Sequence, residues 1–187
     1  RIISFPGFVN LIEMKADRFV QPTKWEDTYE GYMLRLLENR SKCKEVLRLL
    51  YEKVFPDDIG LVVSAYMNLW SARWMCYGQC WTKTPESDAL WRIYAYDKMA
   101  VRIESDEDKI RSMVEKSGES KRYTMKVRDV DYELDKGDDL KTQIELLRKS
   151  RDTTDPFFHK RSVFSHEKEK RIILVDNSKK VLDGLSA

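Results

Sequence analysis

The spacing of apolar residues changes character near the middle of this chain. Between residues 42 and 75, apolar side chains recur every three to four positions, the repeat of a helix with one buried face. From residue 77 onward, short strand-like segments alternate with helical ones. This order predicts an α+β fold with a helix-rich N-terminal half. We expect a mixed sheet with flanking helices, built mainly from the C-terminal half.

Local signals predict where several helices begin and end. Ser4 followed by Pro6 is typical of a helix start, because proline costs no hydrogen bond in the first turn. Residues 42–55 form the clearest amphipathic helix. Pro56 is expected to end it, and Asp57-Asp58 open the next helix.

The second half is divided into strands and helices by turn residues. Further helices are expected at residues 85–97, 107–116 and 138–151. Strands are expected at residues 77–83, 99–105, 121–132 and 167–175.

Length and composition restrict the class of protein. The chain has 187 residues, and Gly and Pro number only 7 and 5, so long irregular stretches are not expected. We expect one domain over residues 1–187. No window approaches the roughly 18 apolar residues that cross a bilayer, so no membrane contact is expected. The formal net charge of +2 removes the simplest argument for a duplex-DNA binder.

The cysteines indicate a reduced, cytoplasmic protein. Cys43, Cys76 and Cys80 are odd in number, and a domain of this size does not need disulfides. Cys76 and Cys80 are four residues apart, a helical spacing rather than that of a zinc ligand pair. We therefore expect free thiols and no metal site.

Aromatic residues are concentrated in one part of the chain. Four of the five tryptophans fall between residues 70 and 91. Such a cluster either builds a core or lines a pocket that stacks a planar ligand. On a helix, Trp91 and Tyr94 are neighbours, and Arg92 adds a polar tip beside them.

Charged residues alternate in the last predicted strand. If residues 167–175 are extended, Glu167, Glu169 and Arg171 share one face. Two carboxylates about 7 Å apart on a strand can divide the labour of stabilising a cation and activating a nucleophile. The alternative is an exposed edge strand whose charges prevent aggregation.

Three blocks of sequence together resemble a known family. They are residues 19–31, the stretch from Cys80-Trp81 through the helix at 87–94 to residue 105, and residues 157–174. Their order and spacing are similar to the prokaryotic domain of unknown function family 2971. Met99-Ala100 stands where that family tends to have glycine. The chain begins at Arg1 without methionine and stops before a further C-terminal segment of the family, so we expect a trimmed sequence.

The resemblance implies a component of bacterial defence against phage. Its layout is also similar to the ADP-ribosyltransferase fold, with an early Arg, a Ser at a strand end and a late Glu-x-Glu strand. In this sequence the corresponding residues are Arg1, Ser105 and Glu167 with Glu169. The resemblance implies that Arg1 holds a phosphate of NAD, that Trp91 or Tyr94 stacks on nicotinamide, and that Arg92 also binds the cofactor. It further implies that Ser105 supports the site, that Glu169 stabilises the ribose cation and that Glu167 orients the acceptor.

Three functions stay open from the sequence. The first is an ADP-ribosyltransferase-like enzyme that uses NAD as cofactor. The second is a non-catalytic sensor module that binds a nucleotide or a protein partner. The third is nucleic-acid binding through basic residues beside an aromatic pair: Lys160, Arg161, Lys168, Lys170 and Arg171 with Phe157 and Phe158.

Overall fold

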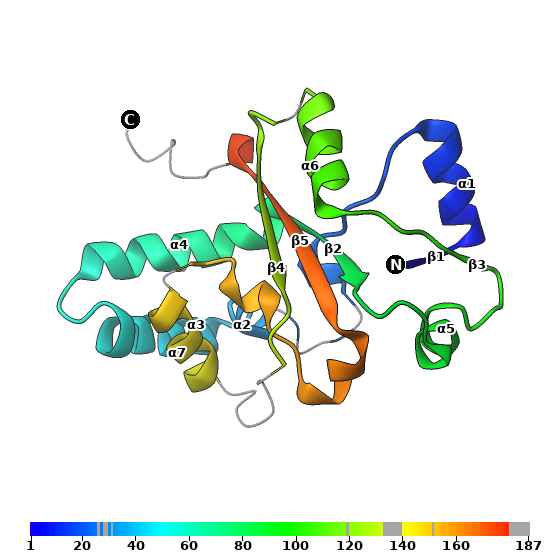
Figure 1. Ribbon diagram of the computed structural model, residues 1–187. Helices are drawn as coiled ribbons and strands as arrows, with labels where there is room; N and C mark the ends of the chain where they lie inside the picture. The colour runs from blue at the N-terminus through cyan, green and yellow to red at the C-terminus, as the bar shows by residue number, and fades with distance from the viewer. Residues whose placement is uncertain are drawn as a thin grey trace.

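The chain folds as the predicted α+β structure, with helices first and an antiparallel sheet completed by the C-terminal half. We analysed a computed structural model, which describes residues 1–25, 27, 30, 32–118, 120–132, 140–150 and 152–179. In Figure 1 the central strands run between two groups of elements. Helices α2, α3, α4 and α7 lie on one side, and α1, α5, β1 and β3 lie on the other.

Two helices of the first half, α1 and α4, begin where the sequence predicts. Helix α1 (Phe5–Met14) is capped by Ser4, whose hydroxyl accepts a hydrogen bond of 3.2 Å from the Gly7 amide. Helix α4 (Ile59–Met75) is capped by Asp58 through the Leu61 amide at 2.9 Å. Between them lie α2 (Tyr32–Leu36) and α3 (Arg40–Leu49), and α3 continues as a π-helical turn over Leu50–Val54. The predicted helix over residues 42–55 is therefore confirmed.

The sheet has three strands in the order β2-β5-β4, and β5 is central. Strand β2 (Cys76–Thr82) and strand β4 (Tyr123–Asp129) both run antiparallel to β5 (Glu169–Asp176). A smaller antiparallel pair joins β1 (Ile2–Ser4) to β3 (Ala100–Arg102). Within the described residues, the parallel component of the expected mixed sheet is limited to one bridge, between Asp131 and His159.

Three helices of the second half flank these strands. They are α5 (Asp88–Tyr94), α6 (Glu107–Lys116) and α7 (Leu140–Ser150). Helix α5 is shorter than the predicted 85–97. Ser87 caps it by accepting from the Leu90 amide at 3.4 Å, so Pro85 lies outside the helix and not in its first turn.

The main hydrophobic core lies between the first helix group and the inner face of the sheet. Its fully buried side chains come from α2 and the turn after it, from α3, α4 and α7, and from β5, and they include Leu34, Leu37, Val46, Leu69, Ile144 and Ile173. Phe157, from a 3-10 turn at Asp155–Phe158, is also completely buried there. Burying each large apolar side chain contributes on the order of 2 kcal/mol, so this core fixes β5 and the turns around it.

Strand β5 begins later than predicted, and the prediction of a Glu-x-Glu strand is wrong. A 3-10 turn over Ser162–Glu167 precedes it, and Lys168 has a left-handed backbone with φ of 45°. The turn is held by the Thr82 hydroxyl, which donates to the Glu167 carbonyl at 2.6 Å. Only Glu169 and Arg171 therefore belong to the strand. Because β5 pairs on both sides, it is also not the exposed edge strand that we kept as the alternative.

The cysteines are free, and two of them lie on β2 rather than on a helix. Cys76 and Cys80 share one face of that strand, because a spacing of four is also an even number of strand positions. Burial raises the pKa of both thiols to about 12. Among the described residues, no helix is both long and apolar enough to span a membrane.

Candidate functional site

A pocket of about 650 Å³ opens beside the middle of β2 and the N-terminal end of β5. It is bounded by residues from 18 to 25, by Asp27, by the end of α5 and by the turn before β5. A smaller cavity of about 70 Å³ adjoins it and shares Arg1, Cys80, Tyr94, Glu167 and Glu169. The volume of the larger pocket lies in the range that holds small-molecule ligands.

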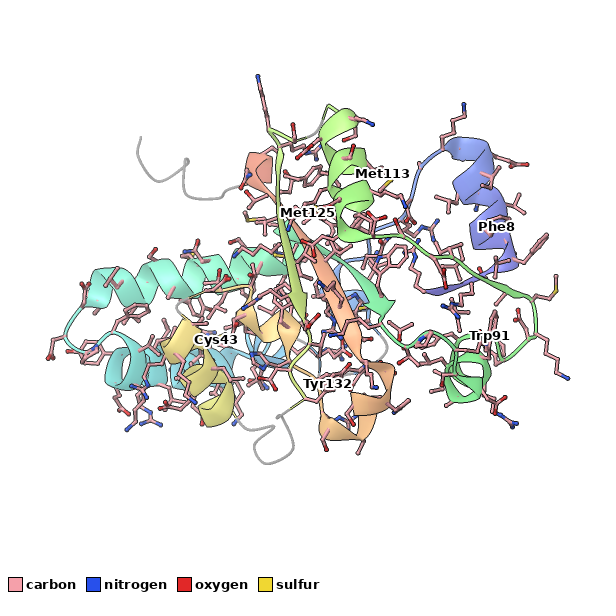
Figure 2. The ribbon with its side chains drawn as sticks, viewed as in Figure 1. Phe8, Cys43, Trp91, Met113, Met125 and Tyr132 are labelled. Atoms are coloured by element: carbon pink, nitrogen blue, oxygen red, sulfur yellow. The ribbon has the colours of Figure 1, made fainter. Side chains whose placement is uncertain are left out.

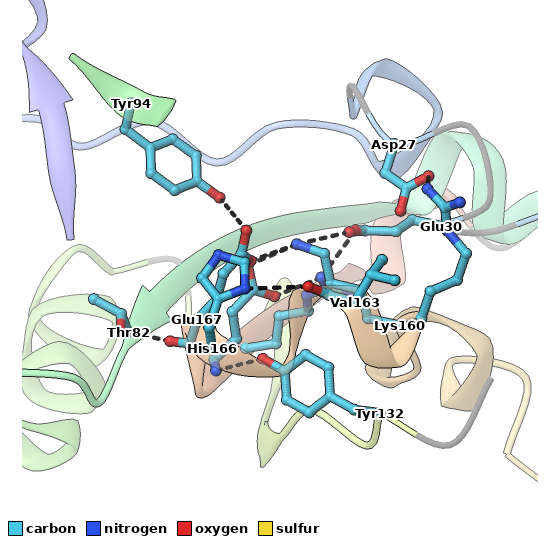
Figure 3. Close-up of polar contacts among 12 residues, drawn as sticks. Asp27, Glu30, Thr82, Tyr94, Tyr132, Lys160, Val163, His166 and Glu167 are labelled. Atoms are coloured by element: carbon cyan, nitrogen blue, oxygen red, sulfur yellow. Dashed lines mark hydrogen bonds and ion pairs between the residues drawn. The ribbon is translucent and has the colours of Figure 1, made fainter. Parts of the chain in front are cut away.

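Five charged side chains form a buried cluster beside this pocket, and four of them line it. Figure 3 labels Glu30, Lys160 and Glu167 of this cluster. The Lys160 ammonium lies 2.6 Å from Glu167, 3.2 Å from Glu30 and 3.3 Å from Glu169. The Arg171 guanidinium lies 2.6 Å from Glu169 and 2.9 Å from Glu30. All five side chains are at most 6% exposed. We call these residues the buried charge cluster.

Arg171 holds the cluster to the sheet. Its side chain is 0% exposed, although it lies on the central strand beside the hydrophobic core. Besides the two carboxylates, its Nη1 donates to the Phe157 carbonyl at 2.6 Å, and its guanidinium lies 4.5 Å from the Trp25 ring centre. A buried charge needs this many partners because leaving it unpaired costs several kcal/mol.

The cluster contains three carboxyl groups and two cations. Burial, then the neighbouring Glu169, raise the pKa of Glu167. Burial likewise raises the pKa of Glu30, against the opposing effect of Arg171 and Lys160. The pKa of Glu169 is lowered, since Arg171 and Lys160 together outweigh its burial. The arrangement therefore keeps Glu169 ionised and makes Glu167 the easier of that pair to protonate.

Two tyrosine hydroxyls contact the glutamates that face the pocket, one at the Glu167 carboxylate and one at the Glu169 backbone. The Tyr94 hydroxyl donates to Glu167 Oε1 at 3.2 Å, and the Tyr132 hydroxyl accepts from the Glu169 amide at 2.7 Å. Tyr94 comes from α5 and Tyr132 from the loop after β4. Figure 3 shows Tyr94 and Lys160 approaching Glu167 from different directions.

Four of the predicted site residues meet at this pocket. Arg1, Tyr94, Glu167 and Glu169 all line both cavities. Arg1 forms an ion pair with Asp17 and lies 5.1 Å above the centre of the Trp81 ring. Glu167 reaches the site from the turn and not from the strand.

The other three predicted residues are not brought to the pocket. Ser105 is exposed in the loop before α6, and its hydroxyl donates to the Asp106 carbonyl. Arg92 is largely exposed on α5, where it pairs with Asp88 at 2.6 Å. Trp91 lies on α5 (Figure 2), where its indole donates to Glu86 and its side chain lines a separate small cavity with Leu90 and Arg102. Of the three α5 residues, Tyr94 is the one whose side chain contacts the cluster.

The basic and aromatic residues of the nucleic-acid interpretation do not form one surface. Lys160 and Arg171 are buried in the cluster. Phe157 and Phe158 are at most 2% exposed and belong to the core. The sequence pattern therefore combined buried charged residues with exposed ones. The segment that contains Phe157 and Phe158 is folded into 3-10 turns and not into a flat surface.

Three residues of the site were not identified from the sequence: Glu30, Lys160 in its buried role, and Trp25. Glu30 and Trp25 lie inside the first block of the family resemblance, which gave them no role. Trp25 is held close to Gly78, where an added Cβ would lie 2.2 Å from Trp25 Cζ2. A glycine near the start of the predicted strand 77–83 was the available signal, since glycine in a strand often marks a close approach.

Comparison with known proteins gives no relative: no family model, no curated protein and no solved structure matches this chain. The family resemblance and the ADP-ribosyltransferase layout therefore remain predictions from the motifs. In the part of the chain that the structure describes, no group of three metal-ligating side chains is arranged to hold a metal ion.

Proposed function

We propose that this pocket cleaves the N-glycosidic bond of NAD and transfers ADP-ribose to an acceptor, as part of a bacterial defence system. The observation that carries the proposal is the pair Glu167 and Glu169. The two carboxyl groups face one pocket, and their pKa values are shifted in opposite directions. Carboxyl pairs of this kind divide roles in reactions that pass through a ribose cation.

The chemistry assigns one step to each carboxyl group. The bond between C1′ of the ribose and the nicotinamide nitrogen breaks, and its electron pair stays with nicotinamide, which leaves as a neutral molecule. Ionised Glu169 stabilises the positive charge that develops on the ribose. Glu167 takes the proton of the acceptor hydroxyl while the acceptor oxygen bonds to C1′. A raised pKa makes the Glu167 carboxylate a better proton acceptor.

The surroundings of the pair support this division. Lys160 contacts both carboxylates, at 2.6 Å and 3.3 Å, so it fixes their separation. Tyr94 donates to Glu167 and lines the same pocket, where its ring can contact the nicotinamide. Ser105 has no part in this mechanism, because it lies away from the pocket.

The test uses the full chain with NAD labelled in the adenylate part, in the presence of a lysate that supplies acceptors. The expected result is release of nicotinamide with transfer of label to an acceptor. Glu169→Gln should lower this activity by about 10³-fold, the effect of removing one preorganised electrostatic contact in a dry site. Ser105→Ala, outside the pocket, is the matched control and should retain full activity.

A second candidate function is a non-catalytic nucleotide sensor. It is favoured by the mutual pairing of all five members of the buried charge cluster, since such a network also serves to hold a binding pocket open. The sensor predicts NAD binding without nicotinamide release, and Glu169→Gln would then leave binding within about threefold of the original. If the lysate acquired no label and the NAD concentration did not fall, the proposed enzymatic activity would be wrong.

A further inference from the structure

The charges that line the large pocket are not all compensated. Most of its charged residues are paired within the protein. The buried charge cluster pairs internally, Arg1 pairs with Asp17, and Arg161 lies 3.2 Å from Asp27. Arg18 and Lys24 differ from these: within the described residues, neither side chain has a hydrogen bond or an ion pair.

Both unpaired cations come from rigid backbone at one wall of the pocket. The chain at residues 18–20 lies along β2, where Val20 and Gly78 exchange backbone hydrogen bonds of 3.0 Å and 2.7 Å. The Gln79 amide donates to the Arg18 carbonyl at 3.1 Å. Lys24 ends a short 3-10 turn over Pro22–Lys24. The backbone that carries these cations is therefore fixed before any ligand binds.

An aromatic side chain lies next to these cations. Trp25 follows Lys24 directly and lines the same pocket. It is held in place by the Gly78 backbone, by Arg171 and by an edge contact with Phe157, whose ring centre is 6.2 Å away. A planar hydrophobic surface beside two cations matches a ligand with a flat ring system and negative charge.

We infer that Arg18 and Lys24 form a phosphate-binding subsite, so that the ligand of this pocket is a nucleotide with at least a diphosphate rather than a free nucleoside or base. This inference rests on the proposed function, which names NAD as the substrate, and it adds the two residues that bind the diphosphate. Arg18 binds one phosphate through its planar guanidinium, and Lys24 neutralises the other. Arg1 is not the main phosphate ligand, because Asp17 already neutralises it.

The experiment measures binding by calorimetry with ADP, pyrophosphate and adenosine, at one fixed salt concentration. The proteins are the unmodified chain, the double variant Arg18→Ala with Lys24→Ala, and the control Lys44→Ala on the exposed side of α3. Removing two charged contacts should weaken ADP binding roughly hundredfold, about tenfold for each. Adenosine affinity should stay the same in all three proteins, and Lys44→Ala should bind ADP normally.

Thermal unfolding keeps the test decisive, because both side chains are exposed and the double variant should unfold at an unchanged temperature. The variant Arg18→Lys, which keeps the charge but not the planar guanidinium, should bind ADP more tightly than the double variant and more weakly than the unmodified chain. ADP affinity that is unchanged in the double variant, or no stronger than adenosine affinity in the original chain, would overturn the subsite. ADP binding that depends on Arg18 and Lys24 without any release of nicotinamide from NAD would uphold the subsite and reject the proposed enzyme.

Discussion

The Tyr94 hydroxyl donates a hydrogen bond to Glu167 Oε1 across 3.2 Å, joining the last turn of α5 to the turn that precedes β5. Burial and the negative charge of Glu167 raise the pKa of Tyr94, so the hydroxyl keeps its proton at neutral pH and acts only as a donor to the carboxylate. This contact favours the ionised form of Glu167 and opposes the burial that raises its pKa.

Tyr94→Phe should therefore raise the pKa of Glu167 further. Measured by carboxyl ¹³C NMR, the Glu167 titration should move to higher pH, and the rising limb of any pH–rate profile should move with it. Tyr132→Phe is the matched control, because that hydroxyl contacts the Glu169 amide and no carboxylate. Equal shifts in the two variants would show that the effect is a general loss of packing.

The buried charge cluster has three carboxyl groups and two cations. Removing a cation should therefore lower the free energy of unfolding more than removing a carboxylate charge. Arg171→Met leaves three carboxyl groups with one cation and should lower the free energy of unfolding by about 3–5 kcal/mol. Glu30→Gln leaves two carboxyl groups with two cations and should cost only about 1–2 kcal/mol. Denaturant unfolding measures both. If Glu30→Gln lowered the free energy of unfolding more than Arg171→Met, the explanation by an excess of carboxyl groups over cations would be wrong.

The contact between Gly78 and Trp25 predicts a steric effect. In Gly78→Ala the new methyl group would lie 2.2 Å from Trp25 Cζ2, so the indole must move. We expect a loss of about 1–3 kcal/mol of stability, the usual range for overpacking. Trp25→Leu in the same chain should recover part of this loss, and a double-mutant cycle measures the coupling. Additive effects of the two substitutions would rule out the steric explanation.

Asp176 at the end of β5 predicts an acid-sensitive contribution to stability. Hydrogen bonds from Arg122 are the main reason that the pKa of this buried carboxyl is lowered to about 2. A lowered pKa means that the stabilisation is complete above the unfolded-state value of about 4 and is lost as the pH falls toward 2. The stability difference between the original chain and Asp176→Asn should be constant from pH 7 to 5 and shrink below pH 4. A difference that does not change with pH would reject the ion pair as its source.

The sequence predicted the elements whose signals are local. Ser4 and Asp58 cap their helices through hydrogen bonds to amides three residues on, and such caps depend only on neighbouring residues. Strand β2 was recognised because aromatic residues and a following proline bound a short segment. For the same reason the fold class could be predicted without knowledge of the pairing.

The site could be predicted only in part, because its geometry depends on contacts between distant segments. Glu167 was assigned to a strand since its neighbours alternate in charge, and no glycine marked the left-handed turn that Lys168 makes. Glu30 and Lys160 carry no local signal of burial. Lysine and glutamate are almost always exposed in proteins. The burial of Glu30 and Lys160 therefore depends on the packing of β5 and the preceding turn, which the sequence alone does not give.

The composition of the buried charge cluster has a consequence for biosynthesis. Its members come from residue 30, from the turn at residues 160–167 and from the last described strand. A nascent chain whose β5 is still inside the ribosome would lack Arg171 at this site, and Glu30 and Glu169 could not form their ion pairs with it. The buried charge cluster is therefore expected to form only after synthesis has passed β5, so a chain that ends before Arg171 would lack it.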